Sequence, residues 1–102
     1  VSGSKRALSL PEVPTTIEAG YPNSDYNFWI GMWVPVKTPR DIVEKLYRET
    51  RKVLDIPSVQ EKLTALGSEP ARMTPAEFDK FFHDDIALNT ELVKAAGIKP
   101  NP

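Results

Sequence analysis

The chain has 102 residues, of which 40% are hydrophobic and 26% are charged, a composition typical of one small globular domain. Its 13 basic and 14 acidic residues give a formal net charge of −1, so we expect no basic surface for nucleic acid or for an anionic membrane. Because cysteine is absent, disulfides, thiolate catalysis and cysteine-ligated metal sites are excluded.

The first 39 residues are rich in proline and show no helical periodicity. Residues 5–8 are expected to end a strand, after which Pro11 and Pro14 favour extended or turn backbone. Residues 15–19 predict a single helical turn that Gly20 ends, and residues 22–25 are a cluster of turn-forming residues.

Residues 26–36 are rich in aromatic and β-branched side chains and are predicted to form a mostly buried strand, interrupted at Gly31. The alternation of a strand places Phe28 on one side and both Trp29 and Trp33 on the other. Gly31 lies between the two tryptophans and leaves space where a ligand or a second backbone segment can approach.

Helical periodicity dominates the rest of the chain. The first predicted helix follows a Thr38 cap, has Pro39 at its first position and runs to about residue 55. The second begins at Pro57. Ile56, which precedes it, cannot accept hydrogen bonds from the first backbone amides, so an acidic cap is either absent or provided by Asp55.

Two signals predict the last helix. After a candidate short strand at residues 69–73, Thr74 and Glu77 have the spacing of a capping box. The helix is expected to run to about Ala96, with Gly97 ending it and Pro100 beyond.

Candidate catalytic and metal-binding groups are sparse. His83 is the single histidine and shares a predicted helix face with Asp79, which supplies two of the three or four ligands that a metal site needs. Asp85 and Asn89 lie one turn apart on an apolar stripe, where such a pair either binds a ligand or hydrogen-bonds to a neighbouring segment. No nucleophile motif is present, so we expect neither an enzyme nor a bound metal or cofactor.

Three segments together carry a resemblance to a known family. They are residues 10–20 (LPEVPTTIEAG), residues 29–39 (WIGMWVPVKTP) and residues 95–100 (AAGIKP). Their order and spacing resemble the C-terminal third of a solute receptor of the tripartite tricarboxylate transporter type, the Bug family.

The resemblance implies an α/β fold: a fragment of a two-lobed, type II-like periplasmic binding protein with three main helices and two or three short strands. Residues 1–24 would end the second lobe. Residues 25–102 would supply the strand that crosses the hinge and the C-terminal helical part of the first lobe. The resemblance also implies a periplasmic protein that binds a small organic carboxylate for membrane transporter subunits. It further implies that most of the residues that hold the carboxylate lie in loops outside this chain.

Two groups of residues are candidates for approaching the solute. Ser4 and Arg6 belong to a cluster of hydroxyl and cationic side chains that can hold a carboxylate through charge-assisted hydrogen bonds. The resemblance places a second group beside the cleft, at the start of the hinge-crossing strand: Tyr26, Asn27, Phe28 and Trp29.

An alternative comes from a different functional class. A small helical interaction module, without solute binding, would pair with another protein or with itself. Exposed apolar surface and unpaired strand edges would mediate that self-association.

Overall fold

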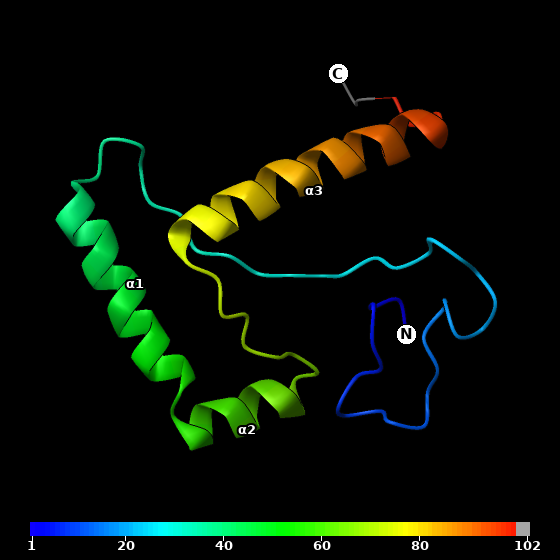
Figure 1. The fold of residues 1–102 in the computed structure, drawn as a ribbon, viewed down its shortest axis with the longest axis horizontal. Helices are drawn as coiled ribbons and strands as arrows, with labels where there is room; N and C mark the ends of the chain where they lie inside the picture. The colour runs from blue at the N-terminus through cyan, green and yellow to red at the C-terminus, as the bar shows by residue number, and fades with distance from the viewer. Residues whose placement is uncertain (100–102) are drawn as a thin grey trace. The chain divides into compact units, whose positions relative to one another are not determined.

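The computed structural model describes residues 1–99 and contains three helices in that part of the chain. They are α1 (Arg40–Leu54), α2 (Pro57–Ala65) and α3 (Pro75–Ala95) (Figure 1). The chain divides into two units, Val1–Pro70 and Ala71–Pro102, so α1 and α2 belong to the first unit and α3 to the second. The three helices were predicted from periodicity, and their existence is confirmed.

The start of α1 differs from the prediction by one position. The N-cap residue is Pro39, which provides no side-chain hydrogen bond, so the predicted Thr38 cap is wrong. The helix begins at Arg40 instead, with Asp41 in its first turn and basic residues in its last turn, the charge order that the helix dipole favours.

Helix α2 follows α1 after two residues, and the two helices contact each other. Its N-cap residue is Ile56, which makes no side-chain cap, while Asp55 is the C-cap of α1. The acidic cap that the resemblance leads one to expect at Ile56 is therefore lost. Gly67 ends the helix in the left-handed conformation, with its amide bonded to the Thr64 carbonyl.

Helix α3 has the capping box that the sequence predicts. The Glu77 amide donates to Thr74 Oγ1 at 3.2 Å, and the Thr74 amide donates to Glu77 Oε2 at 2.7 Å. These bonds satisfy two amide groups that the helix cannot pair internally. Gly97 ends the helix with a left-handed backbone, also as predicted, whereas Pro100 lies outside the described residues.

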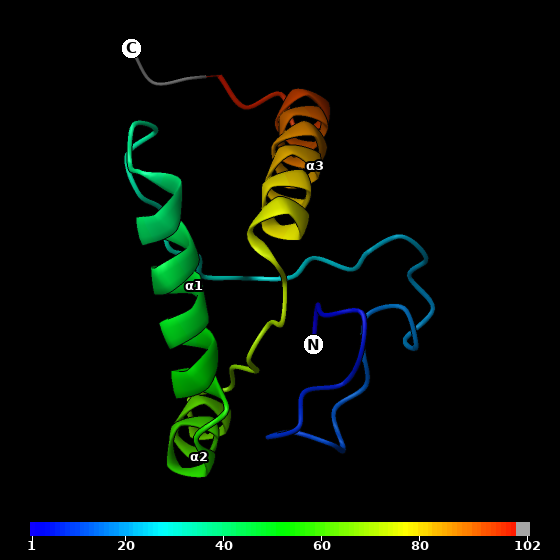
Figure 2. The ribbon, with the colours of Figure 1, turned by 60° about the vertical axis from the view of Figure 1, so that its left-hand side comes forward.

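No strand occurs within residues 1–99, so the two or three short strands of the predicted α/β fold are absent from the described part of the chain. The three segments expected to be strands, residues 5–8, 26–36 and 69–73, have irregular or turn backbone (Figure 1, Figure 2). A strand exists only with a hydrogen-bonded neighbour, and no ladder forms among the described residues. The sequence pattern predicts strand-forming segments, but it does not show whether a neighbouring segment is present to pair with them.

The described residues contain no buried hydrophobic side chain, and Thr15, at 3% exposure, is their one buried residue. The predicted strand is the clearest case, because Phe28 is 87% exposed and Ile30 is 84% exposed. The expectation that residues 26–36 are mostly buried is therefore wrong for this chain. None of the helices within residues 1–99 is both long and apolar enough to cross a bilayer.

Candidate functional site

Residues 1–27 fold back so that the two predicted groups of solute-site residues become neighbours. The Tyr26 amide donates to the Ser2 carbonyl at 2.6 Å, which joins the 2–4 turn to the start of the 26–36 segment. The Thr16 amide donates to the Val1 carbonyl at 2.9 Å, and Thr16 Oγ1 donates to the Ser24 carbonyl at 3.3 Å. The turn at residues 15–20 is thus hydrogen-bonded to Val1 and to Ser24, which adjoin the two groups.

Gly3 and Asn27 form a second close approach between these two segments. A Cβ atom added to Gly3 would lie 3.3 Å from Asn27 Oδ1 and 3.2 Å from the Lys5 carbonyl oxygen, which is tighter than ordinary contact. Glycine at position 3 therefore allows the Asn27 amide to sit against the 2–4 turn. Ser4, the next residue, is exposed.

The Arg6 guanidinium is paired within its own loop. Its Nε donates to both carboxylate oxygens of Glu18, at 3.1 and 2.9 Å, and its Nη1 donates to the Pro11 carbonyl at 3.0 Å. The same ion pair raises the pKa of Arg6 further above its ordinary value, through hydrogen bonding to Glu18. Arg6 is thus engaged within the loop that it closes.

Glu18 belongs to a second capping box, which the sequence analysis did not recognise. The Thr15 amide donates to Glu18 Oε2 at 2.8 Å, and the Glu18 amide donates to Thr15 Oγ1 at 3.1 Å. The hydrogen bond from Arg6, followed by that from the Thr15 amide, lowers the pKa of Glu18 to about 2. The predicted helical turn is confirmed: the Ala19 amide bonds to the Thr15 carbonyl and the turn ends at Gly20.

Lys5, the other cation of the predicted cluster, also has an acidic partner. Its Nζ lies 3.2 Å from Glu69 Oε2, and both groups are in the first unit. The neighbouring cations of the N-terminal segment therefore pair with two different carboxylates. An anionic solute at the 2–4 turn would have to compete with these carboxylates for either cation.

The aromatic residues of the second group have different environments. Phe28 is exposed, Trp29 is half-buried, and the Trp29 ring lies 5.7 Å from the Trp33 ring at a tilt of 51°. The two rings contact each other, but residues 26–36 do not form the strand on which the predicted alternation of sides depends. Gly31, between the tryptophans, is half-buried rather than open.

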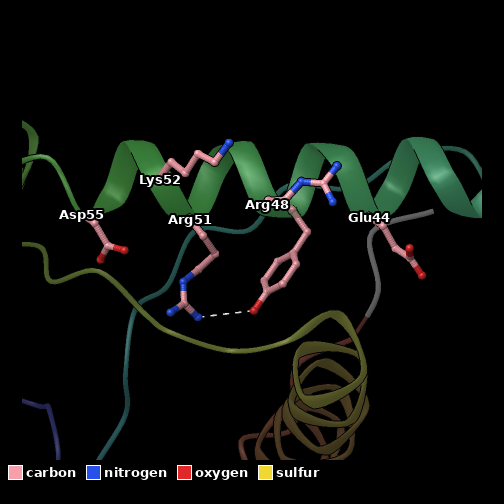
Figure 3. A pocket seen from close by; sticks show the side chains of 6 residues that line it. Glu44, Arg48, Arg51, Lys52 and Asp55 are labelled. Carbon is pink, nitrogen blue, oxygen red and sulfur yellow. Dashed lines mark hydrogen bonds between the residues drawn. The ribbon is translucent and has the colours of Figure 1, made fainter.

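A shallow, open depression on α1 was not among the predicted sites. Figure 3 shows Arg48, Arg51 and Lys52 projecting from one helix, with Glu44 and Asp55 toward its two ends. Tyr47 completes the lining, and Arg51 Nη1 donates to its hydroxyl at 3.3 Å. Charges of both signs line this surface, and Glu49 pairs with Lys52 at 2.9 Å, so the depression has no concentrated cationic character.

The polar candidates on α3 are paired along the helix. Asn89 Nδ2 donates to the Asp85 carboxylate at 3.0 Å and to the Asp85 carbonyl at 2.8 Å. His83 Nδ1 lies 2.8 Å from the Asp79 carbonyl oxygen. Across residues 1–99, no three side chains of the types that bind metals gather into a group.

Comparison with known proteins gives a consistent result. The sequence profile described as "Tripartite tricarboxylate transporter family receptor" matches residues 1–98. A UPF0065 protein from the TAR-I ttuE-ttuC' intergenic region of Agrobacterium vitis is 33% identical over 100 residues, which are 95% of this chain and 29% of that protein. Protein BugT of Bordetella pertussis is 30% identical over 97% of this chain and 30% of its own length.

The fold agrees with a solved structure as well. The structure titled as the periplasmic binding protein BugD superposes with a TM-score of 0.85 at 31% identity, over 98% of this chain and 34% of that protein. The chain spans about three tenths of the length of the curated relatives named here. The match supports a fragment of that fold, with helices but no strands in the described part.

Proposed function

This chain belongs to the tripartite tricarboxylate transporter receptor family, and on that premise we propose that it is the C-terminal third of a periplasmic solute receptor. The receptor would bind a small organic carboxylate and deliver it to the membrane subunits of a tripartite transporter. The observation that carries the proposal is the family match over residues 1–98 together with the BugD superposition at a TM-score of 0.85.

Two facts support the assignment to part of a longer receptor. The chain covers only 34% of BugD, and no hydrophobic side chain within residues 1–99 is buried. A sequence that is 40% hydrophobic ordinarily buries many of those side chains when its domain is complete. The missing core would be completed by the remainder of the receptor.

We assign the two parts of the chain to the two lobes of a binding protein. Residues 1–24 would end the second lobe, and residues 25–102 would cross the hinge and complete the first lobe. In this chain the two parts contact each other through the hydrogen bond from the Tyr26 amide to the Ser2 carbonyl and through the Lys5–Glu69 ion pair. Two lobes linked in this way close over a ligand by rotation about a few backbone positions.

The residues proposed to approach the solute lie at that junction. Ser4 is exposed in the 2–4 turn, and the Asn27 side chain packs against the same turn. Neutral donors of this kind can bind a carboxylate directly or through water. The proposed set is completed by the neighbouring aromatic residues: Tyr26, Phe28 and Trp29.

A thermal-shift screen of the full-length receptor tests the proposal. A carboxylate present at about one hundred times its dissociation constant adds roughly 2.7 kcal/mol to the free energy of unfolding, so the melting temperature should rise by several degrees. Di- and tricarboxylates should raise it, while neutral sugars and amines should not. A shift caused by sugars or amines alone would contradict the carboxylate assignment.

Exposed apolar side chains favour self-association as a second possibility. Phe28 and Ile30 are almost fully exposed in the isolated chain, and exposed apolar patches commonly mark interaction surfaces. Sedimentation separates the two proposals. The interaction module predicts concentration-dependent dimers of the full-length receptor, whereas the receptor proposal predicts that only the 102-residue chain associates.

A further inference from the structure

Arg6 and Glu18 close a loop of the chain by several contacts at once. The guanidinium Nε–H is shared between the two carboxylate oxygens of Glu18, at N–O distances of 3.1 and 2.9 Å, and Nη1 donates to the Pro11 carbonyl within the loop. Charge-assisted bonds from one guanidinium to several acceptors fix its orientation more firmly than a single ion pair does. We call this set of contacts between Arg6, Pro11 and Glu18 the clip.

The clip is connected, through the turn at residues 15–20, to residues that adjoin both groups of proposed solute-site residues. Glu18 also accepts the Thr15 amide at 2.8 Å, and Thr15 is the one buried residue of the described chain. Adjacent to it, Thr16 bonds through its amide to the Val1 carbonyl and through its hydroxyl to the Ser24 carbonyl. A displacement of Glu18 would therefore be transmitted to the 2–4 turn and to the start of the 26–36 segment.

We propose that Arg6 is a positioning residue and not a solute ligand: through Glu18 it holds the 15–20 turn, which keeps the 2–4 turn against Tyr26 and Asn27. This inference rests on the proposed function, and it reassigns the role that the sequence analysis gave to Arg6. A solute carboxylate that took the Nε edge of the guanidinium would displace Glu18, which would also remove the acceptor of the Thr15 amide.

A double-mutant cycle in the full-length receptor tests the inference. The variants are Arg6→Gln, Glu18→Gln and the two combined, and the readout is the dissociation constant for mono-, di- and tricarboxylates. If the clip positions the site, each single variant weakens binding by about three- to tenfold, and the double variant is no weaker than the worse single one. The loss should be the same for all three solute classes.

Direct contact between Arg6 and solute predicts a different pattern. Arg6→Gln would then weaken tricarboxylates more than monocarboxylates, while Glu18→Gln would release the guanidinium and leave affinity unchanged or higher. Either result overturns the inference. Arg40 and Glu44 on α1 provide the control, because Arg40 Nε also bonds a glutamate carboxylate, at 3.0 Å, but the pair lies within one helix and outside the clip, so Arg40→Gln should leave affinity unchanged.

Wild-type affinity, together with the affinities and thermal midpoints of the same variants, separates failure of the positioning inference from failure of the proposed function. If the wild-type receptor binds no carboxylate, the proposed function fails, and the positioning role fails with it. If wild type binds and the effects of Arg6→Gln and Glu18→Gln on affinity simply add, the positioning inference alone is overturned. Coupled midpoints with unchanged affinities would make the clip a stabilising contact only, which also overturns it.

Discussion

Glu18 shows how one carboxylate serves several neighbours. It accepts two hydrogen bonds from Arg6 and one from the Thr15 amide, and these bonds lower its pKa from 4.5 to about 2. All of these donors favour the ionised form, and they outweigh the small opposing effect of desolvation. The Arg6–Glu18 ion pair is partly exposed to solvent, so the pair alone stabilises the fold little. Its contribution to stability depends on the other hydrogen bonds of the network.

This lowered pKa predicts an acid-sensitive contribution to stability. Because the folded pKa lies below the unfolded value, Glu18 stabilises the receptor above pH 4.5, and that stabilisation is lost as the pH falls toward 2. Melting curves of the full-length receptor followed by circular dichroism should therefore depend more steeply on pH in this window for wild type than for Glu18→Gln. Parallel pH dependences of the two proteins would show that the Glu18 contacts do not form in solution.

The spacing of threonine and glutamate in the sequence indicates a capping box near the candidate site. Residues 15–18 and residues 74–77 have the same pattern, a threonine followed three positions later by glutamate, and both form capping boxes. The second was predicted because a long helix follows it, while the first was missed because only one turn follows. The partnership of Arg6 with Glu18 spans 12 positions and depends on that turn, so spacing alone could not reveal it.

Among the elements, the helices were predictable because their determinants are local. Proline at the start, glycine at the end and one apolar stripe lie within each helix or beside it, and α1, α2 and α3 begin and end within about two residues of the predicted positions. The strands were not predictable in this chain, because strand formation depends on a neighbour that residues 1–99 do not provide. Only a partner segment can turn residues 26–36 from extended chain into strand.

The two threonines before helices should differ in their contribution to stability. Thr74 accepts the Glu77 amide, so Thr74→Ala should lower the free energy of unfolding by about 1 kcal/mol. Thr38 precedes α1 but is not its N-cap residue, so Thr38→Ala should change stability much less. Urea denaturation of both variants of the full-length receptor measures the difference. Equal losses would contradict the cap assignments made here.

At the scale of the whole molecule, the main feature is apolar surface without a cover. Ile30 is 84% exposed and Phe28 is 87% exposed, although the segment that carries them has the composition of a core strand. The family assignment accounts for this, because the relatives are about three times longer and their additional residues can cover this segment. Composition and motif order predicted the family correctly, but they could not indicate which side chains this chain leaves exposed.

Substitution at Ile30 tests whether the rest of the receptor covers this surface. In the full-length protein, Ile30→Lys would bury an unpaired charge and should cost about 3 kcal/mol or more, while Ile30→Val should cost only about 1 kcal/mol. Guanidinium denaturation of both variants gives the comparison. If Ile30→Lys leaves stability unchanged, Ile30 is exposed in the receptor as it is here, and the proposed packing is wrong.

The central claim is that this chain is the C-terminal part of a carboxylate receptor. Calorimetric titration of di- and tricarboxylates into the full-length receptor, with the 102-residue chain titrated in parallel, tests it most directly. Our account predicts saturable binding by the full-length receptor and none by the chain alone, because it assigns most of the residues that hold the carboxylate to the rest of the receptor. Failure of the full-length receptor to bind any of these carboxylates would contradict the account.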